Sequence, residues 1–200
     1  MIKKISCLFV VILMAATIVS AQIPNPSFGG KRHQVSTQFG RSLRSFDHLE
    51  NLFIWGISYG QPHNFFMLPG RLNLEFILQR GFGEYSKYDN LLAGISQDIV
   101  FPVFFWLKPR PISNLYFAAN LGGYIGREKT DRLNSVFTFG EKAIVGYNIK
   151  EIITLEFYGQ HYSNGSLTDK NSGFEFICFS VCWNFSFSGN STMYKKWHNL

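Results

Sequence analysis

Two neighbouring stretches of alternating sequence, 152–163 and 174–187, constrain the fold of this chain most strongly. In a β-strand, successive side chains point to opposite faces. In both stretches the odd-numbered positions are mainly large and apolar, whereas the even-numbered positions are mostly polar or small. A short polar segment, 164–173, joins the two. The pattern predicts a β-hairpin with one apolar face and one mostly polar face.

The same alternation recurs along the chain and predicts eight strands, at 33–43, 50–60, 71–80, 91–105, 114–125, 134–147, 150–163 and 173–187. Strands of about ten residues suit a tilted crossing of a bilayer. The aromatic fraction is 17%, and the apolarity is alternating rather than continuous. Together these features predict an all-β fold, an eight-stranded antiparallel transmembrane β-barrel with up-and-down topology. Gln97 and the pair Glu141-Lys142 interrupt the pattern, which predicts a bulge or a rim there.

The N-terminus has the pattern of a secretory signal. Lys3 and Lys4 precede an apolar run from Leu8 to Val19, and small residues lead up to Ala21. A retained membrane anchor is the alternative, but the run is shorter than the ~20 residues that a spanning helix needs. We therefore expect a signal peptide at 1–21, the barrel at 22–187 and a polar C-terminal tail at 188–200.

Charge, histidine spacing and cysteine spacing limit the binding partners, metals and disulfides that we expect. The chain has 19 Lys and Arg against 13 Asp and Glu, and removal of a signal at 1–21 leaves 17 basic side chains. This mild excess suits an anionic membrane surface, and without a basic stripe we expect no nucleic-acid binding. The histidines lack metal-ligand spacing, so we expect no metal and no other cofactor. Cys178 and Cys182 lie about 13 Å apart on one strand face, as interior fillers rather than a disulfide.

Three groups capable of acyl-transfer chemistry lie on the apolar faces, at one end of the hairpin: His161, Ser163 and Glu175. A serine becomes a nucleophile when a base takes its proton, and a carboxylate can orient that base. A hairpin with its midpoint near Thr168 puts His161 almost opposite Glu175. The connection is rich in small and amide residues, which can offer N–H groups to an oxyanion. The alternative is three ordinary rim residues without a shared role.

The connection also carries a short motif: His161-Tyr162-Ser163-Asn164, then Asn171, Gly173 and Glu175. This motif resembles the signature of the lipid A 3-O-deacylase (PagL) family of outer-membrane barrels. The resemblance implies a Ser-His-Glu triad on the outer barrel surface, with Ser163 as nucleophile, His161 as base and Glu175 as its orienting partner. It also implies that Asn164 and Asn171 serve the oxyanion or the substrate. Barrels of this family usually end on an aromatic residue, whereas Phe187 is followed by thirteen residues.

The implied function is an ester hydrolase of the cell outer membrane that removes the 3-O-linked 3-hydroxyacyl chain from lipid A of lipopolysaccharide. Its active site would face the outer leaflet, since the links after the first, third, fifth and seventh strands face outward in such barrels. Two alternatives stay open: an outer-membrane phospholipase with the same chemistry, and a non-catalytic structural or small-pore barrel with a vestigial triad. The sequence does not indicate the oligomeric state. Loop cations are candidates for contacts with lipid A phosphates or are simply solvated: Arg127, Lys129, Arg132 and Lys170.

Overall fold

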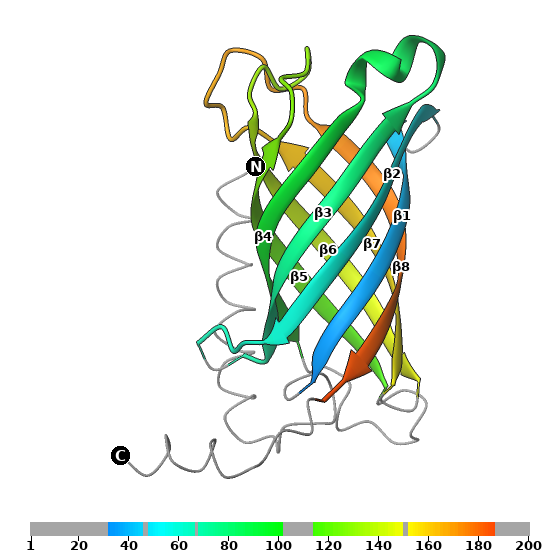
Figure 1. The fold of residues 1–200 in the computed structure, drawn as a ribbon, viewed down its shortest axis with the longest axis vertical. Coiled ribbons are helices and arrows are strands. Elements are labelled where there is room, and N and C mark those ends of the chain that lie inside the picture. The colour runs from blue at the N-terminus through cyan, green and yellow to red at the C-terminus, as the bar shows by residue number, and fades with distance from the viewer. Residues whose placement is uncertain (1–31, 46–47, 67, 102–113, 150–151, 187–200) are drawn as a thin grey trace.

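The computed structural model describes residues 32–45, 48–66, 68–101, 114–149 and 152–186. Within these ranges, eight antiparallel strands follow one another around a closed barrel, and the last strand pairs with the first (Figure 1). The predicted fold is confirmed. The strands are β1 (His33–Ser45), β2 (His48–Pro62), β3 (Gly70–Gly81), β4 (Asn90–Phe101), β5 (Leu115–Gly126), β6 (Phe137–Ile149), β7 (Ile153–Ser163) and β8 (Phe174–Phe185). A short 3-10 helix, η1 (Gly83–Tyr88), precedes β4.

The observed strand ends lie within a few residues of the predicted ones. The largest shifts are in β6 and β7, which each begin three residues later than predicted. The predicted signal peptide at 1–21 and the predicted tail at 188–200 lie outside the described residues. So do residues 102–105 of the predicted fourth strand and Phe187. No helix in the described ranges is long and apolar enough to cross a membrane.

No bulge forms at Gln97 or at Glu141-Lys142, where the sequence predicted a bulge or a rim. Strand pairing is continuous through Gln97 and through the Glu141-Lys142 pair. The charged pair keeps the alternation, because Lys142 turns into the lumen while Glu141 is exposed on the outside. The register shift lies in β1 instead, within residues 41–45, where the pairing with β2 is irregular.

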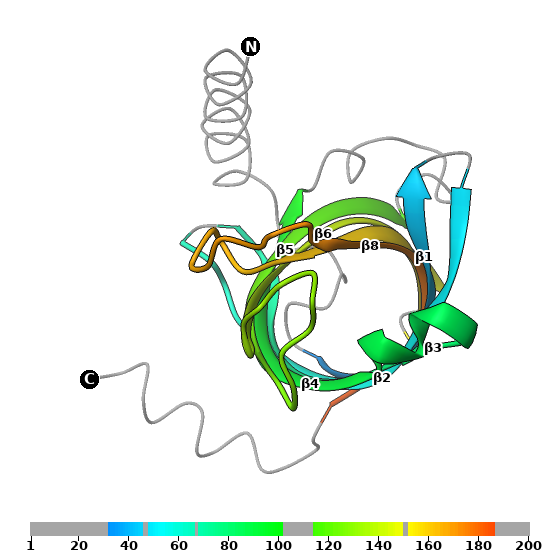
Figure 2. The same cartoon turned by 90° about the horizontal axis from the view of Figure 1, so that it is seen from above.

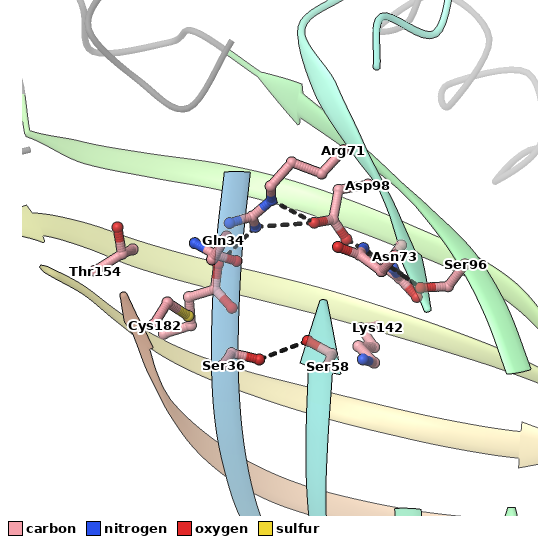
Figure 3. Close-up of polar contacts among 12 residues, drawn as sticks. Gln34, Ser36, Ser58, Arg71, Asn73, Ser96, Asp98, Lys142, Thr154 and Cys182 are labelled. Carbon is pink, nitrogen blue, oxygen red and sulfur yellow. Dashed lines mark hydrogen bonds and ion pairs between the residues drawn. The ribbon is translucent and has the colours of Figure 1, made fainter. Parts of the chain in front are cut away.

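A polar network fills the lumen (Figure 3). Arg71 Nη2 of β3 lies 2.8 Å from Asp98 Oδ2 of β4 and 2.7 Å from Glu156 Oε1 of β7. Lys142 of β6 lies 2.5 Å from Glu75 of β3. All of these side chains are at most 8% exposed. Side chains fill the interior of eight-stranded barrels in this way, so the strands are cross-linked through the lumen by ion pairs.

The outer wall is apolar around the whole barrel. Large apolar side chains project from the odd-numbered positions of β7 and β8, as the alternation predicts, whereas Cys178 and Cys182 are buried inside. Such an apolar band is the surface that a transmembrane barrel presents to lipid. Its exposed members include Val35, Phe39, Trp55, Ile57, Leu74, Phe76, Ile95, Leu121, Phe157, Phe179, Val181 and Trp183.

The two ends of the barrel differ. At one end lie η1 and the connections 127–136 and 164–173, and η1 caps the rim beside β2 and β3 (Figure 2). At the other end, β1 begins at His33 and β8 finishes at Phe185. Barrels of even strand number keep both termini on the periplasmic side. The end that carries η1 is therefore the extracellular one.

Candidate active site

The hairpin of β7 and β8 brings the three sequence-predicted residues together at the extracellular end. Its register pairs His161 directly with Glu175. Ser163 is the last residue of β7, two positions beyond His161. The even-numbered residues on either side of His161, Gln160 and Tyr162, are buried inside the barrel. Strand alternation therefore presents the imidazole, the hydroxyl and the carboxylate on the outward face.

The imidazole and the carboxylate approach each other across the two strands. His161 Nδ1 lies 3.9 Å from Glu175 Oε1, and the two side chains are 41% and 63% exposed. Ser163 is half-buried, and no hydrogen bond between described residues joins it to His161. Separations of this kind are common in unliganded catalytic sites, whose hydrogen bonds tighten when substrate binds. Because Nδ1 faces Glu175, Nε2 is the ring nitrogen that does not face this carboxylate.

The amides of Asn164 and Asn171 order the connection between the two strands. Asn164 is fully buried, and its Nδ2 donates to the carbonyl oxygens of Leu133 at 2.5 Å and of Lys170 at 2.8 Å. The backbone N–H of Asn164 donates to Asn171 Oδ1 at 3.0 Å. The N–H of Gly165 makes no hydrogen bond with another described residue. The asparagines thus fix the backbone beside Ser163, where the N–H of Gly165 has no partner among the described residues.

Two glycines of the connection pack closely against the site. Gly173 has a φ of +68°, and a Cβ there would lie 2.8 Å from His161 Cε1. Gly165 has a φ of +60°, and a Cβ there would lie 2.7 Å from the ring of Phe139. Phe139 is the β6 residue directly opposite Ser163. Both positions require a left-handed backbone and a missing side chain, which only glycine supplies without strain.

A groove of about 520 Å³ runs across the outer wall from this site. Its middle is formed by three small residues in register on adjacent strands, Ala119, Ala143 and Gly159. A Cβ on Gly159 would meet nothing within 4 Å, so the groove is open there. His161 and Glu175 line its upper edge. The arrangement places a mainly apolar groove directly beside the imidazole.

Comparison with known proteins decides the family. The family model "Lipid A 3-O-deacylase (PagL)" matches residues 32–184, which include every described strand apart from the last residue of β8. The chain belongs to the lipid A 3-O-deacylase (PagL) family. Among curated proteins, no sequence match is found.

This PagL-family chain is similar to solved structures, one of which has a TM-score high enough to show a shared fold. The structure described as the outer membrane enzyme PagL is 13% identical, with a TM-score of 0.56, over 75% of this chain and 98% of that one. Neisserial surface protein A is 16% identical, with a TM-score of 0.49, over 78% of this chain and 97% of that one. Family membership and the closed eight-stranded barrel identify the chain as an outer-membrane β-barrel protein.

Sequence reasoning missed two residues that the barrel of this PagL-family chain brings to the site. Phe139 lies opposite Ser163, and Glu141 lies opposite His161, both on β6. Glu141 also lines the groove. The signal was present, because Glu141 is a carboxylate at an otherwise apolar odd-numbered position, but the sequence did not say which strand would lie beside it.

A polar vestibule of about 530 Å³ opens on the extracellular side, lined by η1 and by Arg132, Glu50, Gly173 and Glu175. Burial acts to lower the pKa of Arg132, but hydrogen bonds to Glu50 and Tyr88 outweigh it and raise the pKa. Arg132 Nη2 lies 2.5 Å from Glu50 Oε1, so this cation braces the vestibule wall. Nowhere in the described chain do three or more His, Cys, Asp or Glu side chains form a group that could hold a metal ion.

Proposed function

We propose that this protein hydrolyses the ester bond between lipid A and its 3-O-linked 3-hydroxyacyl chain in the outer leaflet. The observation that carries the proposal is the direct pairing of His161 with Glu175 on the outward face of a PagL-family barrel, with Ser163 two residues beyond. An outward-facing site meets acyl chains within the membrane, whereas a site in the filled lumen would not.

The proposed reaction follows the logic of a serine triad. Ser163 Oγ attacks the ester carbonyl carbon while His161 Nε2 accepts its proton. Glu175 accepts a hydrogen bond from His161 Nδ1 and stabilises the imidazolium. The tetrahedral intermediate collapses, the sugar 3-oxygen leaves with the proton from His161, and an acyl-enzyme remains. Water activated by His161 then releases the 3-hydroxy fatty acid, and the chemistry needs neither metal nor cofactor.

The connection between β7 and β8 would supply the oxyanion donors. The free N–H of Gly165 is two residues from Ser163, and the Asn164 and Asn171 amides hold this backbone in place. We therefore assign Asn164 and Asn171 a role in shaping the oxyanion site through the backbone. Fixed N–H donors aimed at a developing oxyanion contribute about 3–4 kcal/mol of transition-state stabilisation.

The groove would hold the scissile acyl chain. Its small-residue middle, Ala119, Ala143 and Gly159, begins beside His161 and continues across three strands. An acyl chain laid there would replace contacts with neighbouring lipid tails while its carbonyl stays at Ser163. The sugar headgroup would lie toward the vestibule, which shares Glu175 with the groove.

Mass spectrometry of lipid A tests this proposal. Cells expressing the protein should yield lipid A lacking one hydroxyacyl mass, and Ser163→Ala should abolish that loss while the barrel still inserts. Ser166→Ala is the matched control, because Ser166 is an exposed serine of the same connection and lines neither the groove nor the vestibule, and it should keep full activity. Released lysophospholipid would indicate the phospholipase alternative, and unchanged lipids would indicate a non-catalytic barrel. Full activity in Ser163→Ala would show that Ser163 is not the nucleophile.

A further inference from the structure

Glu141 on β6 is a carboxylate on the outer wall without a partner in the described part of the chain. In the strand register it lies between Leu121 of β5 and His161 of β7. Its neighbours on the same face of β6 are Phe139 and Ala143. Glu141 is exposed, and it makes no hydrogen bond or ion pair with another described residue. Apolar side chains therefore surround this carboxylate on three sides, and the imidazole lies on the fourth.

A carboxylate in such surroundings is unfavourable unless something bonds to it. Transfer of a polar group to an apolar environment without a hydrogen bond costs roughly 1–3 kcal/mol on the scale of protein mutations, and more for a charge. In the lumen of the same barrel, the acids Glu75, Asp98 and Glu156 all have cationic partners. Glu141 lines the groove, so the molecule that fills the groove is the candidate partner.

The position of Glu141 relative to Ser163 limits which part of that molecule it meets. Ser163 pairs with Phe139, and Glu141 is two residues further along β6, so Glu141 and Ser163 are diagonal neighbours. Diagonal neighbours on one face of an antiparallel pair are roughly 7–8 Å apart, within reach of long side chains. The Glu141 carboxylate can thus reach atoms a few bonds from a carbonyl held at Ser163.

We propose that Glu141 accepts a hydrogen bond from the 3-hydroxyl of the scissile acyl chain and so selects hydroxylated chains. This inference rests on the proposed function. The 3-hydroxyl is two carbons beyond the carbonyl carbon, where the chain leaves Ser163 and passes the Leu121–Glu141–His161 row into the groove. A carboxylate accepts but does not donate, which matches a hydroxyl donor. An unsubstituted chain would leave the carboxylate desolvated and unpaired.

Two chromogenic esters test the inference: 4-nitrophenyl 3-hydroxydodecanoate and 4-nitrophenyl dodecanoate, hydrolysed by the full-length protein in detergent micelles. The wild type should prefer the hydroxylated ester in kcat/KM by about 10- to 100-fold, the scale of one hydrogen bond to a charged group. Glu141→Ala should lose most of this preference by slowing only the hydroxylated ester. Glu141→Gln keeps an acceptor oxygen and should retain part of it. Glu128→Ala, a loop carboxylate 65% exposed, should change neither rate.

The outcomes separate this inference from the proposed function. Equal losses on both esters in Glu141→Ala would mean that Glu141 acts through His161 or the fold, and the inference would be overturned. A wild type without preference would overturn it as well, even if lipid A were deacylated. Conversely, hydroxyl selectivity that depends on Glu141, in a protein that leaves lipid A intact, would contradict the proposed function alone.

Discussion

The lumen and the outer wall of this barrel treat charged groups in opposite ways. Inside, Arg71 is held between Asp98 and Glu156 at 2.8 and 2.7 Å. Outside, His161 and Glu175 are 3.9 Å apart and exposed, and Glu141 has no partner among the described residues. The inner groups have nowhere else to bond, so they pair tightly. The outer groups have hydrogen-bonding capacity that the described residues do not use, and the proposed substrate would use it.

This contrast separates the polar groups with a structural role from those on the same strands to which we assign a catalytic role. Removal of one member of a buried ion pair leaves an uncompensated charge and destabilises the fold. Removal of an exposed, loosely held group changes stability little. Lumen variants should therefore affect folding, and variants on the outer wall beside Ser163 should affect chemistry.

The largest expected effect is that of His161→Ala on the rate of hydrolysis. Loss of a triad member lowers the rate of hydrolysis by about 10³- to 10⁴-fold or more. The free energy of unfolding should change by less than about 0.5 kcal/mol. Release of 3-hydroxy fatty acid measures the rate, and denaturant unfolding in lipid vesicles measures the free energy of unfolding. His63→Ala, which removes an exposed histidine bonded to Gln97 at the other end, should keep the rate. A destabilised His161→Ala barrel would break the contrast.

Arg71→Met should have the opposite profile. Asp98 and Glu156 would lose their shared cation in the lumen, and breaking a buried pair in this way costs about 3–5 kcal/mol of unfolding free energy. Activity per folded molecule should stay at the wild-type level. Arg127→Met is the matched control, because its ion pair is exposed and contributes at most about 1 kcal/mol. Equal stabilities of the two variants would show that the lumen network does not brace the barrel.

Gly173→Ala should lower both the rate of hydrolysis and the stability, each by less than the two variants above. The added Cβ would press on His161 Cε1 at 2.8 Å and sit at a φ of +68°. We expect a rate lower by about 10- to 100-fold, because misplaced catalytic groups lose that much, and strain of about 1–2 kcal/mol. Gly123→Ala, where the new Cβ has only ordinary contacts, should be close to wild type in rate. A Gly173→Ala protein with normal kinetics would show that the imidazole has more room than the structure indicates.

The smallest effect concerns the rim at Asp89, after η1. A hydrogen bond from the N–H of Gly81 lowers the pKa of this carboxyl, with a further contribution from Arg80. Because the folded protein lowers this pKa, the Asp89 carboxylate stabilises the fold at pH values above the ordinary pKa of the group. That stability is lost as the pH falls through the lowered pKa. Asp89→Asn should therefore narrow the difference in stability between neutral pH and pH below the ordinary value near 3.8. Denaturant unfolding of both proteins across this range measures it.

Much of the fold was predictable because strand alternation is a local property. The odd-numbered positions of β7 and β8 face outward as predicted, and the short connection fixes His161 opposite Glu175. Residue types at two-residue spacing were enough for the first result, and the length of the connection supplied the second. The predicted bulge at Glu141-Lys142 failed because alternation was judged by hydrophobicity alone. Lys142 is charged, but its side chain lies in the lumen because it forms an ion pair with Glu75 there.

The sequence by itself thus determined the eight strands, the direction of the side chains in the regularly alternating stretches and the local pairing within the β7–β8 hairpin. The tertiary structure decided which distant residues meet. Closure of β1 on β8 and the register of all eight strands bring Arg71 to Glu156, 85 positions away along the chain. The same register places Glu141 beside His161 and packs Gly173 against its ring. The physical reason is that alternation sets which way a side chain points, whereas only the hydrogen-bonded register and closure of the barrel set what it points at.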